Sequence, residues 1–329
     1  MVANKHLSGG LRCPYEKDNF KVFFSLIDYR NAMFTSKDMG KILQFLDSFD
    51  CRDELIEWMK ERPKGIPWIR EVEGDRDIVI VVPTADFDGK YSRACREEVF
   101  KGQHIVFVES GRKKDFYFNF AHYVNAGIKK AMDYDPKWVI YSGDDVYTID
   151  DISVLKRELD SIDNREYDVV FLKPHLNYSV PLYIGEKRFT YDLLRTFVGR
   201  TNGRLYKKYE VKYFYAAKNK LTPLFFKKVR GTDFICTQAL GIFSSHYLAS
   251  RFESLFDETY INEHEDLDMS LQLFLEGVHY KIINYNIGGY VGGTLGLDVD
   301  RGLRQVAGRT YFNWKFENLY SKLIMMGLK

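Results

Sequence analysis

The sequence predicts an α/β protein with a mostly parallel central sheet and a small helical extension at its N-terminus. Continuous β-branched runs such as Ile78–Pro83 suit strands that are buried on both faces, as in a sheet covered by helices. These runs alternate with segments of helical periodicity, which is the order expected of βαβ units. A third observation is chemical, because the apolar run Trp138–Tyr141 leads through a glycine directly into Asp144 and Asp145.

The N-terminal extension covers residues 1–75. Its apolar residues recur at helical spacing in two groups, which are Met39, Ile42, Leu43, Leu46 and Phe49, then Leu55, Ile56 and Met59. Prolines and a glycine between positions 63 and 67 end this pattern. We expect the extension to pack on the main domain, and its sequence indicates no separate function.

Residues 76–175 form the first half of the main domain. The strands expected here are 78–83, 104–108, 138–141 and 168–172. Helical segments are expected between them at 92–100, 120–132 and 152–162, and Asp151 can cap the last of these. Strands separated by helices of this length predict parallel pairing.

Residues 176–300 form the second half, and residues 301–329 contain a C-terminal helix. From 177 to 230 the periodicity is lost, and Tyr, Lys and Arg are frequent. Basic pairs such as Lys207-Lys208 either meet a phosphate-bearing acceptor or belong to a solvated face. The elements expected after this segment are a strand at 237–243, an amphipathic helix that Gly277 ends, a strand at 280–285, a glycine-rich loop at 288–296 and a final helix at 309–326.

The composition is that of a globular protein, with 45% apolar and 29% charged residues. A net charge of only +2 argues against a nucleic-acid partner. The four cysteines, at positions 13, 51, 95 and 236, have no paired spacing, which favours reduced thiols in the cytoplasm over a zinc site or disulfides. We expect neither a signal peptide nor a transmembrane segment, so a lipid-linked substrate would be reached by peripheral contact with the membrane.

Asp144 and Asp145 follow a predicted buried strand at the point where open α/β sheets bind ligands. Paired carboxylates there suit Mg²⁺ or Mn²⁺, since hard cations prefer oxygen ligands and share them with substrate phosphates. The alternative is structural, because Gly-Asp-Asp is also common in turns.

Four carboxylates crowd one predicted helix N-terminus: Glu263, Glu265, Asp266 and Asp268. The helix dipole stabilises each such group by about 0.3–1 kcal/mol, which is a sufficient structural explanation for one or two of them. Four together repel one another, and this repulsion raises carboxyl pKa values toward those of a general base.

Taken together, residues 77–320 resemble a family-2 glycosyltransferase of the GT-A fold, the Rossmann-like fold of nucleotide-diphospho-sugar transferases. The first strand with Pro83 and Thr84 is similar to the turn that opens the family's nucleotide site. Glu109 stands where the family has an acidic residue that contacts the nucleobase. Asn125 belongs to an Asn-Ala-Gly segment that resembles a helix motif ahead of the third strand. The resemblance implies that these four residues take part in binding the donor.

The resemblance also assigns roles to the acidic motifs. Asp144, aided by Asp145, falls at the family's Asp-x-Asp metal motif, although Ser142 occupies the first Asp position. The Glu-Asp pair after a Phe-Asp-Glu turn implies Asp266 as the catalytic base, with Glu265 next in line. Residues 289–294 lack the His that many relatives place there, which weakens the expectation for the metal. Processive members of the family carry a Gln-x-x-Arg-Trp motif, and this sequence does not have these residues in the required spacing.

What the resemblance implies is an inverting, hexosyltransferase-like enzyme that uses a nucleotide-diphosphate sugar and a divalent metal. The acceptor would be a glycan, a lipid-linked saccharide or a protein. Two alternatives stay open: a non-catalytic carbohydrate- or nucleotide-sugar-binding protein of the same fold, and a nucleotidyltransferase. The acidic turn 83–88 argues against the latter, which usually has a Gly-rich basic loop there. The 288–296 loop either closes over the donor or simply connects two elements.

Overall fold

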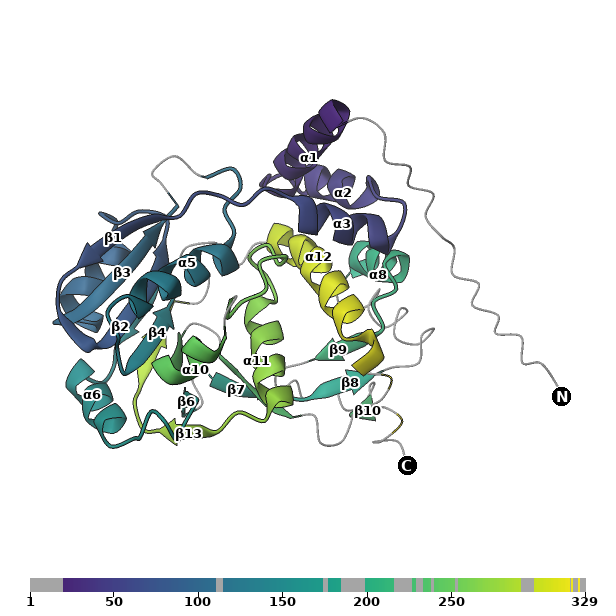
Figure 1. Cartoon of the computed structure of the whole chain (residues 1–329). Helices are drawn as coiled ribbons and strands as arrows, with labels where there is room; N and C mark the ends of the chain where they lie inside the picture. Colours follow the sequence, from purple (N-terminus) through teal and green to yellow (C-terminus); the bar gives the residue numbers. More distant parts are fainter. Residues whose placement is uncertain are drawn as a thin grey trace.

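The computed structural model of the chain describes residues 20–110, 115–173, 177–184, 199–215, 227–228, 233–237, 240–251, 254–290 and 299–319, together with residues 321 and 325. These ranges form an α/β domain with a group of helices at one end (Figure 1). Cys13, parts of the segment 177–230 and most of the glycine-rich loop lie outside the described residues.

The centre of the described structure is a seven-stranded sheet with the order β1-β3-β2-β4-β12-β6-β13. The strands are β1 Trp68–Val72, β2 Asp75–Thr84, β3 Gln103–Glu109, β4 Trp138–Ser142, β6 Val169–Leu172, β12 Leu240–Ser244 and β13 Tyr280–Ile283. Five strands run in one direction, whereas β1 and β12 run in the other. The mostly parallel sheet predicted from the sequence is therefore confirmed.

Strand β2 lies between β3 and β4, although it precedes both in the chain. The chain leaves β2 toward β3, and later leaves β4 toward the other side of the sheet. The boundary between β2 and β4 is thus a topological switch point, where open α/β sheets bind ligands outside the carboxyl ends of the strands. Thr84 ends β2 and Ser142 ends β4, so these two residues and those that follow border the switch point.

Helices cover both faces of the sheet. One face packs on α4 (Lys90–Ala94), on the π-helix that follows it (Cys95–Val99) and on α6 (Ile152–Asp160). The other face packs on α5 (Phe120–Met132), α10 (Ser245–Ser250) and α11 (Glu265–Glu276). Because successive side chains in a strand point to opposite faces, Ile140 of β4 joins the first core and Tyr141 the second.

Single side chains explain several helix ends. The N-cap Asn119 accepts a hydrogen bond from the backbone N–H of His122 at 3.0 Å, and α5 begins at the next residue. Asp151 caps α6 in the same way, as predicted. Gly277 adopts a left-handed φ of 67° and ends α11, which is the conformation that favours glycine at this position.

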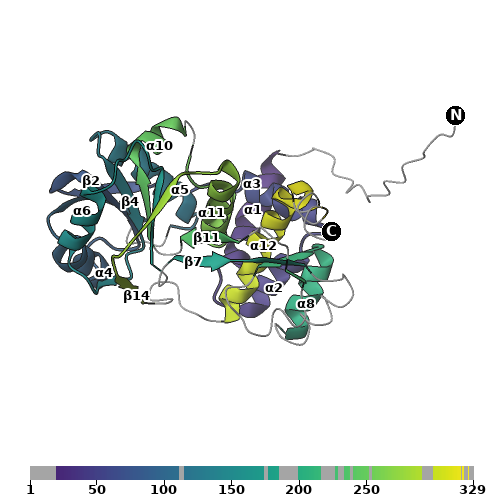
Figure 2. The same ribbon diagram turned by 90° about the horizontal axis from the view of Figure 1, so that it is seen from below.

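The predicted N-terminal helices are present as α1 (Phe20–Phe34), α2 (Met39–Asp47) and α3 (Arg52–Glu61). They share an apolar core with α8 (Gly199–Lys208) and α12 (Val299–Lys315). Figures 1 and 2 show α12 lying against these N-terminal helices, although almost the whole chain separates them in sequence. The extension therefore packs on the C-terminal helix of the main domain.

A buried guanidinium joins the extension to the sheet domain. Arg62 follows α3 and is only 3% exposed. Its Nε donates to Asn31 Oδ1 at 2.6 Å, and its two Nη groups donate to the carbonyls of Pro63 and of residues 116–118. Burial lowers the pKa of Arg62 to about 10, so the group still carries its charge at neutral pH. The carbonyl oxygens around it compensate for its loss of water.

Three boundaries differ from the predictions. The strand expected at 237–243 is divided between β11 (Phe234–Thr237) and β12 (Leu240–Ser244), which belong to different sheets. Strand β1 lies inside the segment assigned to the helical extension, and it forms an edge of the sheet. Its residues are largely exposed and mix apolar with charged side chains, so they lack the continuous apolar run of a central strand. The final helix begins at Val299 and not at Arg309, because Gly302 and Gly308 obscure the helical periodicity of its first turns.

Three smaller sheets complete the described strands. They pair β7 (Asn177–Val180) with β11 (Phe234–Thr237), β8 (Leu182–Ile184) with β9 (Tyr213–Tyr215) and β10 (Lys227–Lys228), and β5 (Val146–Thr148) with β14 (Ile287–Gly289). Among the described helices, none combines the length and the apolar character needed to cross a membrane.

Candidate functional site

The switch point of the sheet brings together two residues predicted to bind the donor. The Thr84 hydroxyl donates a 2.8 Å hydrogen bond to Asp144 Oδ2. Its oxygen also lies 2.7 Å from Ser92 Oγ, and all three residues are buried. Pro83 is a buried member of β2 beside them and pairs with Val108 of β3. The Asp144 carboxylate is therefore fixed at the end of β4 by a side chain from β2.

Asp145 is held through its backbone. Its carbonyl accepts a 2.8 Å hydrogen bond from the N–H of Tyr290, just after β14 pairs with β5. Gly288 of β14 allows this approach, because a side chain there would collide with the Tyr147 ring. The Tyr147 and Tyr290 rings lie 4.9 Å apart. The beginning of the predicted glycine-rich loop is thus attached directly to the aspartate pair, while residues 291–298 lie outside the described ranges.

Ser142 ends β4 and is fully buried. Its hydroxyl donates to the carbonyl of the adjacent Gly143 at 2.9 Å, so it supports the turn that presents the two aspartates. In the part of the chain that the structure describes, no group of three or more His, Cys, Asp or Glu side chains forms a ready-made metal site. Two carboxylates fit Mg²⁺ or Mn²⁺ when diphosphate oxygens and water supply the other ligands.

Glu109 ends β3 at the same edge of the sheet and is buried. Its Oε1 accepts a 3.3 Å hydrogen bond from the backbone N–H of Phe87. Its Oε2 lies 3.6 Å from an Nη of Arg70, which belongs to strand β1. Strand β2 separates β3 from β4, so Glu109 and the aspartate pair are two strand spacings apart, about 10 Å.

A second acidic pair begins α11. Glu265 is buried, and its Oε2 atom has no hydrogen-bond partner among the described residues. Burial and the negative charge of Asp266 raise the pKa of Glu265 well above its ordinary value. Burial also raises the pKa of Asp266 to about 7, even though the backbone N–H of Leu267 donates to its Oδ1 at 2.8 Å. A carboxyl group with a pKa near the working pH has the proton affinity of an efficient general base.

Tyr141 connects this acidic pair to the sheet. Its hydroxyl shares a 2.6 Å hydrogen bond with Thr237 Oγ1, and the backbone N–H of Thr237 donates to Ser270 Oγ of α11. Burial raises the pKa of Tyr141, and the negative charges of Asp266 and Glu265 add to this effect. Tyr141 is the residue before Ser142, which ends β4 ahead of the aspartate pair. The helix that carries the second acidic pair is therefore tied through Thr237 to the same strand that leads into Asp144 and Asp145.

The other two carboxylates of the crowded helix start are engaged in ion pairs. Glu263 accepts hydrogen bonds from Arg301 Nε at 2.6 Å and from Gln305 Nε2 at 3.1 Å. Asp268 is fully buried and receives Lys315 Nζ at 2.6 Å. These basic partners come from α12, and they could not be predicted because nothing in the spacing of α12 reveals which carboxylates it faces. Among the described residues, ion pairs thus engage Glu263 and Asp268 but neither Glu265 nor Asp266.

Lys315 also lies 2.6 Å from Asp257, to which the hydroxyl of Tyr311 donates at 2.8 Å. Burial tends to raise the pKa of Asp257, but the charge of Lys315 outweighs it, and the pKa lies below its ordinary value. Burial raises the pKa of Asp268 to about 6 despite the same lysine. One ammonium group therefore holds the turn before α11 and the first turn of α11 against the last helix.

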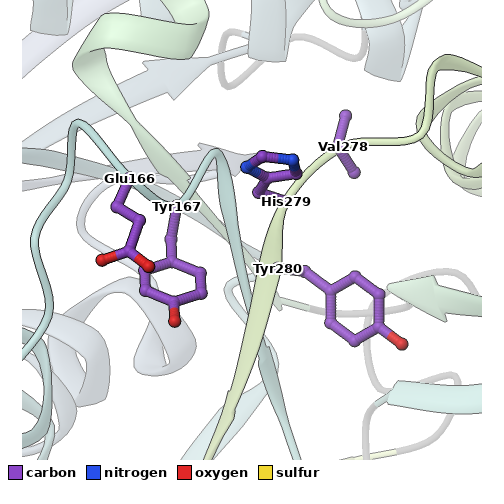
Figure 3. A pocket seen from close by; sticks show the side chains of 5 residues that line it. All are labelled: Glu166, Tyr167, Val278, His279 and Tyr280. Atoms are coloured by element: carbon purple, nitrogen blue, oxygen red, sulfur yellow. The ribbon is translucent and has the colours of Figure 1, made fainter.

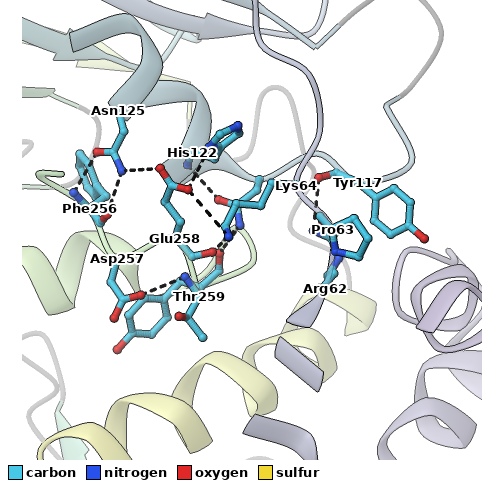
Figure 4. A network of polar contacts seen from close by, with 12 residues as sticks. Arg62, Pro63, Lys64, Tyr117, His122, Asn125, Phe256, Asp257, Glu258 and Thr259 are labelled. Atoms are coloured by element: carbon cyan, nitrogen blue, oxygen red, sulfur yellow. Dashed lines mark hydrogen bonds and ion pairs between the residues drawn. The ribbon is translucent and has the colours of Figure 1, made fainter. Parts of the chain in front are cut away.

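Asn125 does not lie at the strand ends. Its side chain exchanges hydrogen bonds with the backbone N–H and carbonyl of Phe256 and donates to Glu258 Oε1 at 3.0 Å (Figure 4). The other oxygen of Glu258 lies 2.9 Å from His122 Nδ1. Lys64 approaches the same carboxylate at 3.9 Å. Asn125 thus fixes the Phe-Asp-Glu turn, and its predicted contact with the donor stays a prediction.

A shallow groove of about 340 Å³ lies elsewhere on the domain (Figure 3). It is lined by Glu166 and Tyr167, which precede β6, and by Val278, His279 and Tyr280, which lead into β13. These residues mark the amino ends of the two parallel strands. The groove therefore lies at the opposite edge of the sheet from both acidic pairs.

The chain matches no protein-family model, and no curated protein is significantly similar to it in sequence.

Proposed function

We propose that the protein is a glycosyltransferase of the GT-A type, which moves a sugar from a nucleotide-diphosphate donor to an acceptor hydroxyl. The observation that carries the proposal is the Asp144 carboxylate held at the switch point by Thr84, together with an acidic pair on α11, a helix that is linked to Tyr141 of β4 through Thr237 and Ser270. One pair is fixed on the donor side by Thr84, and the other has the raised pKa values of a base. Nucleotide binding at a topological switch point agrees with this arrangement.

The donor would lie across the carboxyl ends of β3, β2 and β4. Its nucleobase would contact Glu109, and its diphosphate would reach Asp144 and Asp145. A divalent ion held by the two aspartates and the diphosphate would stabilise the negative charge of the leaving group. The hydrogen bond from Thr84 keeps the Asp144 carboxylate oriented before the donor arrives, which lowers the cost of organising the site.

Asp266 would remove the proton from the acceptor hydroxyl as the oxygen attacks the anomeric carbon. In this single displacement the new C–O bond forms opposite the bond to the diphosphate, so the configuration inverts. Glu265 beside it is buried, and its raised pKa favours its neutral form, which keeps a second negative charge away from Asp266. The proposed acceptor is a glycan, a protein or a lipid-linked saccharide, each of which can offer a hydroxyl group.

The test is a thermal-shift screen with UDP-, GDP- and dTDP-sugars, each with and without Mn²⁺, followed by product analysis with simple saccharide acceptors. A shift that requires both the sugar nucleotide and the metal, with an inverted product, is the expected result. A shift with free glycan alone would instead indicate a carbohydrate-binding protein without catalysis. Transfer of a nucleotidyl group, detected as released diphosphate from a triphosphate, would indicate a nucleotidyltransferase.

A further inference from the structure

Strand β1 brings an exposed tryptophan to the proposed donor site. Trp68 begins β1 and pairs directly with Glu109 of β3. Side chains of directly opposed residues in an antiparallel pair lie on the same face with Cβ atoms about 4.5–5.5 Å apart. Trp68 is 64% exposed, whereas Glu109 is 6% exposed. A large aromatic surface open to solvent therefore stands beside a buried carboxylate at the carboxyl edge of the sheet.

Arg70 stands on the same face of β1 and contacts the same carboxylate. Its guanidinium carbon lies 4.1 Å above the centre of the Phe87 ring, and an Nη lies 3.6 Å from Glu109 Oε2. Arg96 covers the same ring, at 4.9 Å. Phe87 in turn packs edge-on against Phe107 in the core. Arg70 is thus supported by an aromatic ring, and its guanidinium lies within ion-pair distance of Glu109 Oε2 and also of Asp88 Oδ2, at 3.8 Å.

We propose that Trp68 is the surface on which the nucleobase of the donor stacks, and that Arg70 is a positioning residue that orients Glu109 toward the edge of that base. The inference rests on the proposed function and adds to it a binding surface from outside the glycosyltransferase-like region. The Glu109 carboxylate can accept a hydrogen bond from a ring N–H or an amino group of the base. The Arg70 guanidinium can donate a hydrogen bond to an adjacent carbonyl oxygen or ring nitrogen of the base. Stacking on an indole suits any base, since every base has a π face.

The spacing of the sheet supports this assignment. Trp68 lies on β1, which is three strand spacings from β4, about 14 Å. Glu109 lies one spacing closer to the aspartate pair. The three groups follow one line along the strand ends in the order aromatic surface, carboxylate and aspartate pair. A nucleoside diphosphate presents its base, its ribose and its phosphates in a matching linear order.

The test separates base binding from phosphate binding. Isothermal titration calorimetry with Mn²⁺ compares UDP, GDP and dTDP with inorganic pyrophosphate, on the parent and on Trp68→Ala. We expect Kd for the preferred nucleotide to rise roughly 5- to 150-fold in the variant, as for loss of one base–aromatic stack, while Kd for pyrophosphate is unchanged. Trp68→Phe should retain most of the affinity. The matched control is Tyr280→Ala, which removes a half-exposed aromatic from the opposite edge strand β13 and should change neither constant.

Fluorescence gives a second readout. Of the four tryptophans, Trp58 and Trp138 are buried, Trp314 is partly buried and Trp68 is the most exposed. Nucleotide stacking on Trp68 should therefore quench a part of the solvent-exposed emission in the parent that is missing in Trp68→Phe. In Arg70→Gln, the Kd values for the three nucleotides should differ less from one another than they do in the parent. The control is Arg76→Gln, which changes an exposed arginine near the other end of the sheet and should leave these differences unchanged. The stacking role of Trp68 is wrong if Trp68→Ala binds the nucleotide with the Kd of the parent, or if its Kd for pyrophosphate rises as much as its Kd for the nucleotide. Either result leaves the proposed function standing. A parent that binds none of the three nucleotides overturns both.

Discussion

The Thr84 hydroxyl donates a 2.8 Å hydrogen bond to Asp144 Oδ2, although the two residues are 60 positions apart in the sequence. This contact crosses the switch point of the sheet, from the end of β2 to the turn after β4. The carboxylate of Asp144, the proposed metal ligand, is therefore oriented by a contact with a strand of the sheet and not by a free loop.

Replacing Thr84 by Val should therefore affect both stability and donor binding. Valine preserves the shape but removes a buried hydrogen bond to a charged group, which is worth about 1.5–3 kcal/mol. We expect the free energy of unfolding, measured by urea denaturation, to fall by about that amount and Mn²⁺-dependent donor binding to weaken. Thr84→Ser keeps the hydroxyl and should restore binding. Equal donor affinity in the Val and Ser variants would show that the contact does not organise the site.

Replacing Asp266 by Asn should abolish transfer while donor binding remains measurable by calorimetry. The amide preserves the size of the side chain but cannot accept a proton from the acceptor hydroxyl. Glu97→Gln is a suitable control, because its side chain is 60% exposed and it lies on the far face of the sheet. Undiminished transfer in Asp266→Asn would exclude this residue as the base, and Glu265→Gln would then be the variant to assay.

The raised pKa of Asp266 predicts opposite pH trends for activity and stability. The base must be ionised, so the rate of transfer should rise with pH and level off above about 7. The folded protein binds this proton more tightly than the unfolded chain, whose Asp has a pKa of about 3.9. The contribution of Asp266 to stability is thus fully present below about pH 4 and is lost as the pH rises through about 7.

The measurement is urea denaturation of the parent and of Asp266→Asn across this pH range. Other carboxylates, such as Asp257 with its lowered pKa, have the opposite trend, so the informative quantity is the difference between the two proteins. We expect the Asn variant to gain stability relative to the parent as the pH rises. A pH-independent difference would mean that Asp266 titrates normally in the folded state.

Lys315→Met should destabilise the protein strongly. The change leaves the fully buried Asp268 without its cationic partner, and loss of one partner of a buried ion pair costs about 3–5 kcal/mol. Lys212→Met is the matched control, because Lys212 pairs with the partly exposed Glu317 at 3.1 Å and such surface pairs contribute about 0–1 kcal/mol. Similar urea midpoints for the two variants would contradict the assigned role of Lys315.

Two glycines of α12 should respond to alanine in opposite ways. A Cβ at Gly308 would lie 2.6 Å from the carbonyl oxygen of Glu263, so Gly308→Ala must displace the turn before α11 and should lower both stability and activity. A Cβ at Gly302 would meet nothing within 4 Å. Gly302→Ala should therefore stabilise the helix by up to about 1 kcal/mol. Thermal unfolding of both variants checks the prediction, and equal shifts would contradict the close packing at Gly308.

The sequence alone determined where most helices and central strands of the sheet domain lie along the chain. Runs of β-branched residues and helical periodicity are local patterns, and they located β2, β3, β4 and β6 as well as α5, α6 and α11 to within a few residues. The end of one of those strands also indicated Asp144, since paired carboxylates after a buried strand can be recognised without knowing their neighbours, whereas Thr84 and Glu109 were indicated only by the resemblance to glycosyltransferases. Strand β1 was missed because an exposed edge strand lacks the continuous apolar run that identifies a central one.

Only the tertiary structure decided how the acidic residues differ from one another. Glu263, Glu265, Asp266 and Asp268 are equivalent in the sequence, but within the described structure α12 forms ion pairs with the first and last of them and with neither of the other two. Burial and charge pairing depend on which distant helix packs against a residue, and no local pattern encodes that choice. The same holds for Trp68, whose place beside Glu109 follows from the antiparallel register of β1 on β3.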